Sequence, residues 1–173
     1  IRAGSIVTAM TRNGNMFGIR VSGLGERWFT APVNTPQGLF FTGFSQEQAN
    51  PDMGDSAIIE TFGIGGAAMI AAPGVTRFVG AGGMEAARAV SEEMAEIYLE
   101  RNMQLQIPGW DFQGACLGLD IRRVVETGIT PLINTGIAHK EAGIGQIGAG
   151  TVRAPLACFE QALEALAESM GIG

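Results

Sequence analysis

Two long segments of this chain place apolar residues at helical spacing. Between residues 84 and 101 the apolar positions return every three or four residues, with acids between them: Ala87, Val90, Met94, Ile97 and Tyr98. After Pro155 a heptad-like seam is formed by Leu156, Phe159, Leu163, Leu166 and Met170, and Gly171 follows it. We therefore predict amphipathic helices over Met84–Arg101 and Pro155–Met170. A shorter helix is predicted over Ile121–Thr127, with Asp120 as its N-cap and Gly128 after its last turn.

Short alternating or apolar runs predict strands. Ser5–Met10 and Met16–Val21 flank an Asn-Gly dipeptide at 13–14, which is a strong hairpin signal. Ala57–Ile59, Val75–Val79 and Thr130–Ile137 are short enough to be strands too. Because a hairpin pairs its strands antiparallel, we expect an α+β fold with a small, mostly antiparallel or mixed sheet, packed amphipathic helices and glycine-rich loops.

Composition narrows the functional classes. A length of 173 residues fits a single domain over 1–173. With 46% apolar and only 16% charged residues, the chain is expected to be globular and to bury a surface in an oligomer. A net charge of −6 argues against a nucleic-acid partner. The sequence shows no signal peptide or membrane-spanning run, and Cys116 and Cys158 are far apart, so we expect a cytoplasmic protein with no membrane partner.

One stretch, Asn50–Gly66, is dense in groups that do chemistry. Its acids and hydroxyls precede a run of glycines, and the candidates are Asp55, Ser56, Glu60, Gly63, Gly65 and Gly66. Free N–H groups between a strand and a helix favour an anion, and Glu60 with a raised pKa could carry out acid–base catalysis. The alternative is a loop whose acids cap turns and whose glycines allow positive φ. Asp52 and Asp55 could share Mg²⁺, but caps explain them as well, so we assign no metal and no cofactor.

A second stretch, Asn134–Gly150, repeats this pattern. Its candidates are Asn134, Thr135, His139, Gly145 and Gly148, and His139 is the sequence's one histidine. We predict that the two stretches form two walls of one anion-binding cleft, with His139 and Glu60 as catalytic residues. The alternative is that both are tight turns of a glycine-rich fold.

Arginines supply the candidate grips for a carboxylate or phosphate. Arg27 is assigned to catalysis, and Arg20, Arg122 and Arg123 to binding a small anionic substrate, because a guanidinium binds such groups with two parallel hydrogen bonds. Surface ion pairing is the alternative for each of them.

Five runs occur in a specific order: MTRNGNMFGIRVSG, GERWFTAPVNTPQGLFF, NPDMGDSAIIETFGIGG, DIRRVVETGITPLINTGIAHKEAGIGQIGAG and APLACFEQAL. Over nearly the whole chain they resemble the YlbE-like family of bacterial proteins, long of unknown function and associated with the anaerobic allantoin pathway. That family is similar to one subunit of oxamate carbamoyltransferase, which works with two other subunits, one of them FdrA-like. The resemblance implies that the chain is the C-terminal part of a longer subunit.

The reaction that the resemblance implies is phosphorolysis of oxalurate to oxamate and carbamoyl phosphate, or its reverse. Two alternatives stay open. The chain could be a non-catalytic assembly subunit, or a nucleotide-binding enzyme that uses the G-x-G-x-x-A run over Gly63–Ala68.

Overall fold

The hairpin predicted at Asn13-Gly14 opens the first of three small antiparallel sheets. We analysed a computed structural model, which describes residues 4–80 and 82–172. Strands β1 (Val7–Arg12), β2 (Met16–Val21) and β3 (Phe29–Pro32) lie in the order β1-β2-β3. The Asn13 carboxamide oxygen accepts hydrogen bonds from the N–H groups of Asn15 and Met16 and so stabilises the turn.

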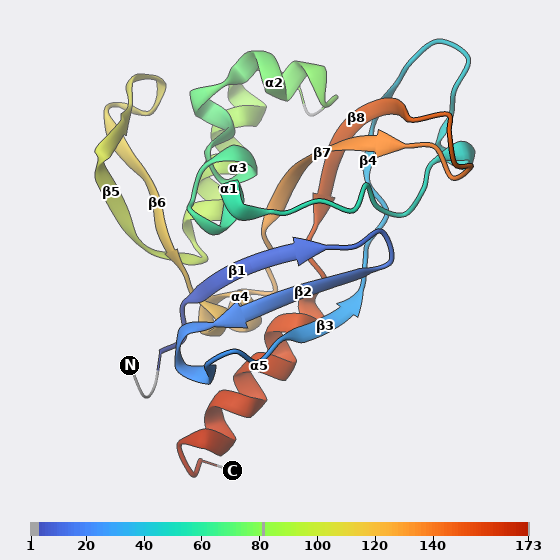
Figure 1. The fold of residues 1–173 in the computed structure, drawn as a ribbon. Coiled ribbons are helices and arrows are strands. Elements are labelled where there is room, and N and C mark those ends of the chain that lie inside the picture. Colours follow the sequence, from blue (N-terminus) through green and yellow to red (C-terminus); the bar gives the residue numbers. More distant parts are fainter. Residues whose placement is uncertain (1–3, 81, 173) are drawn as a thin grey trace.

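The other two sheets lie above the first in Figure 1. One has the order β4-β8-β7, from β4 (Gln37–Phe40), β8 (Gln146–Arg153) and β7 (Leu132–Ala138). The other is a two-stranded hairpin, β5 (Tyr98–Ile107) with β6 (Gln113–Leu119), which projects from the body of the molecule. All these pairings are antiparallel, and the predicted α+β class is confirmed.

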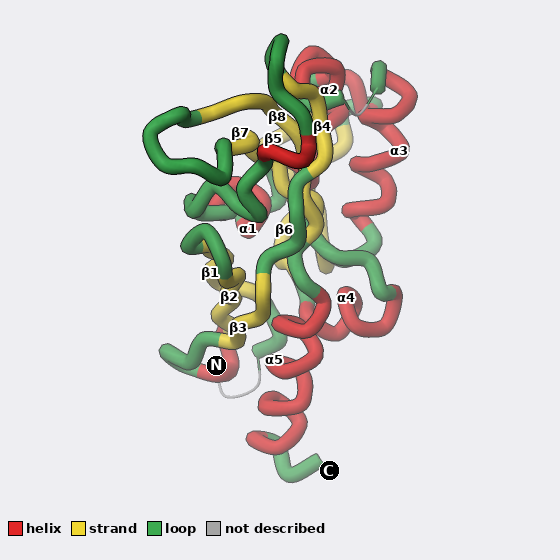
Figure 2. Tube along the Cα trace, turned by 90° about the vertical axis from the view of Figure 1, so that its right-hand side faces the viewer, coloured by secondary structure: helices red, strands yellow, loops and turns green. Residues whose placement is uncertain are grey.

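Helices cover one side of these sheets and connect them. The longer ones are α3 (Met84–Ala95) and α5 (Leu156–Ser169), and the shorter ones are α1 (Ile58–Thr61), α2 (Pro73–Phe78) and α4 (Ile121–Thr127). Single 3₁₀ turns are η1 (Ser22–Leu24), η2 (Gln46–Gln48) and η4 (Pro108–Trp110), and η3 (Gly65–Ala71) is a longer 3₁₀ segment with a kink at Ala68. Helix α5 packs on β2, β3 and α4, whereas α3 and α2 lie at the opposite end of the molecule (Figure 2).

The predicted cap of α4 is confirmed. The Asp120 carboxylate accepts a hydrogen bond from the N–H of Arg122, and Gly128 ends the helix with φ +71°. The helix predicted over Met84–Arg101 is correct only to Ala95, because residues 98–101 belong to β5. Ile97 and Tyr98 are both buried although they are adjacent, and adjacent residues do not share one helix face.

Two other predictions are wrong. Ala57–Ile59 is not a buried strand: α1 begins at Ile58, which is 67% exposed. Residues 75–78 are helical because Pro73 begins α2, where its fixed φ suits the first turn. In the second glycine run, Gly148 and Gly150 lie inside β8. A Cβ on Gly148 would stand 2.4 Å from the Leu39 carbonyl oxygen, so this glycine lets β4 approach β8.

The larger of two hydrophobic clusters joins most of these elements, and the smaller one contains Met69, Val79, Ala87 and Ala149. The larger cluster contains residues of the first sheet, α4, α5 and the β5–β6 hairpin, among them Ile19, Trp110, Leu119 and Phe159. In the part of the chain that the structure describes, no helix has the length and apolar character needed to cross a bilayer.

Candidate functional site

Arg12 is the centre of a buried polar cluster that joins the two predicted stretches. It ends β1, just before the hairpin turn, and its side chain is 2% exposed. Its Nη1 lies 3.1 Å from an oxygen of Asp52, and its Nη2 pairs with Asp55 and donates to the Thr135 hydroxyl at 3.3 Å. Asp52 and Asp55 come from the first stretch and Thr135 from the second. The predicted contact between the two stretches is therefore present, and Arg12 connects them.

The two aspartates of this cluster differ in exposure. The Asp52 side chain is 2% exposed, and its second oxygen accepts hydrogen bonds from the N–H groups of Gly14 and Gly54, so it holds the hairpin turn in place. The Asp55 side chain is 51% exposed. Solvent therefore reaches the cluster on the Asp55 side.

Glu60 is a second buried acid between the two stretches. It is 4% exposed, and its Oε1 accepts hydrogen bonds from the N–H of Gly66 at 3.0 Å and of Asn134 at 3.2 Å. Burial raises the pKa of this carboxyl, while these hydrogen bonds and the nearby Arg12 charge oppose the shift. The Gly66 amide proposed for a bound anion thus already holds an anion that the chain supplies.

The glycines around Glu60 have a steric role. Gly63 has φ +90°, and a Cβ there would stand 1.8 Å from the Cys116 carbonyl oxygen. A Cβ on Gly66 would stand 1.9 Å from the Leu132 carbonyl oxygen. These positions let the loop after α1 contact β6 and β7 directly, which brings Glu60 to Asn134.

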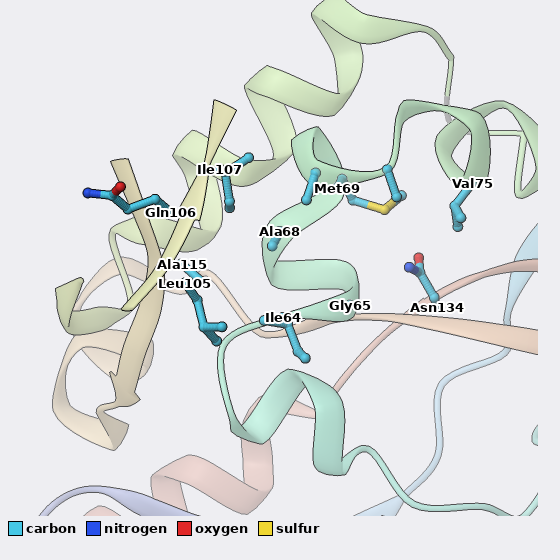
Figure 3. A pocket seen from close by; sticks show the side chains of 12 residues that line it. Ile64, Gly65, Ala68, Met69, Val75, Leu105, Gln106, Ile107, Ala115 and Asn134 are labelled. Carbon is cyan, nitrogen blue, oxygen red and sulfur yellow. The ribbon is translucent and has the colours of Figure 1, made fainter. Parts of the chain in front are cut away.

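An apolar pocket of about 370 Å³ opens beside this cluster. Its walls come from η3, α2, the β5–β6 hairpin and β7 (Figure 3). Asn134 is the polar residue on the β7 side, and its amide is turned toward Met69 and Val75. Its buried Oδ1 has no hydrogen-bond partner among the described residues.

The other predicted residues lie outside the Arg12 cluster. His139 follows β7, where its N–H donates to the Gly145 carbonyl and its Nδ1 accepts from the N–H of Glu141. Because a strand rises about 3.3 Å per residue, it stands roughly 13 Å along the chain from Thr135. Ser56 is exposed and forms an isolated antiparallel β-bridge with Thr11.

The arginines that were predicted to bind the substrate contact other groups of the chain. Arg20 pairs with Glu26, and the Arg27 guanidinium lies 4.9 Å from the centre of the Phe29 ring. Arg122 pairs with its own helix cap, Asp120, and Arg123 donates to the Tyr98 carbonyl.

Sequence reasoning missed Arg12, the one cation of the cluster. A single arginine before an Asn-Gly turn gave no signal, because no pattern showed that its side chain points inward. In the part of the chain that the structure describes, no cluster of three or more His, Cys, Asp or Glu residues could hold a metal ion.

Comparisons with known proteins give strong but partial matches. The pattern of the family described as "Oxamate carbamoyltransferase subunit AllG" matches residues 1–56. The chain is 99% identical over all 173 residues to the Escherichia coli (strain K12) protein of that name, of which it spans 41%. It is 48% identical over 172 residues, or 99% of its length, to the "Uncharacterized protein YahG" of the same organism, of which it spans 36%.

A solved structure has the same fold. The "conserved protein of unknown function from Enterococcus faecalis V583" matches with a TM-score of 0.91 and 50% identity. The match covers 98% of this chain and 40% of the other. The chain therefore spans about two fifths of the length of each of these relatives.

Proposed function

We propose that this chain is one part of an oxamate carbamoyltransferase subunit, in a cytoplasmic, multi-subunit enzyme of allantoin degradation that includes an FdrA-like partner. The observation that carries the proposal is the 99% identity over the whole chain to a protein of that name. The chain forms one domain of that longer subunit.

The reaction is phosphorolysis of oxalurate or its reverse. A phosphate oxygen attacks the ureido carbonyl carbon, the bond from that carbon to the oxamate nitrogen breaks, and the nitrogen takes up the proton that phosphate loses. The products are carbamoyl phosphate and oxamate. The site must hold two anions and stabilise the negative charge that develops on the carbonyl oxygen.

The Arg12 cluster is our candidate for the carboxylate site of oxalurate and oxamate. Asp55 is a half-exposed carboxylate that already contacts the buried guanidinium, so it marks where a substrate carboxylate would bind when the Asp55 side chain turns to solvent. Glu60, whose pKa is raised by burial, is our candidate for moving the proton. Both roles are proposals about the assembled enzyme.

The first experiment tests the activity. The longer subunit, purified with its partner subunits, is given oxalurate and phosphate, and carbamoyl phosphate is measured. We expect formation of carbamoyl phosphate that stops when the longer subunit is left out. An assembled complex that forms none would overturn the proposed function.

The second experiment tests the site with Asp55→Asn. Because Asp55 competes with the substrate for Arg12, its removal should lower the KM for oxalurate about two- to fivefold, which is the range of an exposed ion pair. Asp111→Asn, on an 80% exposed side chain that pairs with Arg88, is the matched control and should leave KM unchanged. An unchanged or raised KM in Asp55→Asn contradicts the assignment of Arg12.

The remaining predicted residues are tested in the same assay with His139→Ala and Arg27→Ala, with melting temperatures checked. A loss of about two orders of magnitude in kcat in either variant would move the site away from the Arg12 cluster.

A non-catalytic assembly role is the second candidate. The specific observation in its favour is the number of large apolar side chains on the surface, including Ile58, Phe62 and Phe78, each more than half exposed. Normal activity in the Asp55, His139 and Arg27 variants, together with loss of the complex when the subunit is omitted, is the result expected for this role.

A further inference from the structure

The pocket beside Asn134 has an almost entirely apolar surface. Its floor is formed by Ile64, Ala68, Met69, Ile107 and Ala115, and its volume is about 370 Å³. An open pocket of this kind exposes apolar side chains to water at a free-energy cost of about 25 cal/mol per Å². A surface of this composition is typical of a place where another apolar group binds.

The rim of the pocket is apolar as well. We define the apolar rim as Ile59, Val75, Leu105 and Leu117, which are 51%, 40%, 41% and 40% exposed. Val75 and Leu105 line the pocket, Ile59 contacts Gly65 on its wall, and Leu117 shares a strand face with Ala115. The exposed apolar surface is therefore continuous with the pocket and spans α1, α2, β5 and β6.

The β5–β6 hairpin forms one wall of the pocket, and part of it is exposed to solvent. The β5–β6 sheet has only two strands, and it is anchored to the core by Ile107, Ala115 and Leu119. It projects from the molecule in Figure 1, and residues 103–106 near the end of β5 are all exposed. Packing against a further element would stabilise it.

We propose that the apolar rim and its pocket dock the remaining part of the longer subunit, which inserts apolar side chains between η3 and the β5–β6 hairpin. This occupant follows from length, because each of the relatives described above continues well beyond the two fifths that this chain matches. A covalently linked segment is present at high effective concentration, so it covers this surface before a separate molecule can.

The test uses the full-length subunit with one cysteine placed at the rim. Leu105→Cys and Leu117→Cys are compared with Met170→Cys at the end of α5, which is remote from the hairpin and is 45% exposed in the structure of this chain. The three positions thus have matched exposure here. Cys116 and Cys158 are fully buried, and peptide mass spectrometry reads thiol labelling at each site separately. Melting temperatures confirm that each variant is folded.

We expect the rim cysteines to label about tenfold more slowly than Met170→Cys or slower still, because labelling requires local opening of the docked part. This protection should be the same at low and high protein concentration and without partner subunits. Equal labelling at the rim and at Met170→Cys overturns the proposal. Protection that disappears on dilution assigns the surface to a second copy, and protection that requires the other subunits assigns it to them. Either result also overturns the proposal.

Discussion

At the scale of single residues, Arg12 carries a buried charge that depends on the residues around it. Its guanidinium is almost completely buried between two aspartates, and its Nε has no hydrogen-bond partner among the described residues. A buried charge of this kind is tolerated only while its counter-charges stay in place. We therefore expect Arg12 and Asp52 to stabilise the fold, whatever the cluster binds.

Arg12→Met should destabilise the protein strongly. The substitution leaves the Asp52 carboxylate buried without its counter-charge, and breaking one side of a buried pair costs about 3–5 kcal/mol. Urea denaturation measures the free energy of unfolding. Arg20→Met is the matched control, because the Arg20–Glu26 pair is on the surface, where an ion pair contributes up to about 1 kcal/mol. A loss in Arg12→Met no larger than in the control would contradict this account.

The stability of the protein should depend on pH through the ionisation of Glu60. Its pKa in the folded state is raised above the ordinary value of 4.5, so between these two values the folded protein binds more protons at Glu60 than the unfolded chain does. Stability from this group therefore falls as pH rises through that window. Glu60→Gln cannot ionise, so its free energy of unfolding relative to the wild type should increase with pH there and level off above it.

The measurement for Glu60 is a series of urea titrations between about pH 4 and pH 8. Glu126→Gln, on the exposed part of α4, serves as the control and should follow the wild type. A Glu60→Gln curve parallel to the wild type would show that burial does not raise the pKa.

Part of this residue-scale picture was predictable. The sequence singled out Asp55, Glu60, Asn134 and Thr135, because polar residues beside apolar runs and glycines are a local pattern. It could not identify Arg12 as their shared cation, since that role depends on a contact across more than 100 residues. The assignments of Arg20 and Arg27 came from residue type alone, and their neighbours in space are not encoded nearby.

At the scale of elements, the glycines after α1 decide how closely the loop approaches the sheets. Gly63→Ala would combine positive φ with a Cβ 1.8 Å from a backbone oxygen of β6. Because backbone cannot move aside as a side chain can, we expect a loss of about 3 kcal/mol or more in the free energy of unfolding. Gly74→Ala, inside α2 with open space around it, should instead stabilise by about 0.4–1 kcal/mol. Thermal or urea unfolding measures the free energy of unfolding of both variants. A Gly63→Ala variant that is as stable as the wild type would contradict the close approach of the loop to β6.

Local patterns predicted elements well where one signal dominated. The Asn13-Gly14 hairpin and the capped helix α4 were correct because turn and cap chemistry act over a few residues. The pattern failed at 98–101, where β5 begins and the core takes in both Ile97 and the adjacent Tyr98. It also failed at α1, whose apolar side chains are exposed, since a short apolar run does not show whether it is buried.

At the scale of the whole molecule, the shared core should make the domain unfold as one unit. Trp110 is buried in the turn that connects β5 to β6 and belongs to the same core cluster as the first sheet. In a Trp28→Phe variant, which removes a 44% exposed side chain, Trp110 is the remaining tryptophan. Its fluorescence and the far-ultraviolet circular dichroism should then give coincident urea transitions. A separate, earlier fluorescence transition would show that the hairpin unfolds independently.

The β4–β8 pairing has a consequence for synthesis on the ribosome. Gln37 of β4 pairs with Thr151 of β8, so the partner of this strand is made more than 100 residues later. At translation rates of about 5–20 residues per second, β4 waits on the order of ten seconds with both edges unpaired. Strands in that condition are targets for chaperones and for pairing with neighbouring nascent chains.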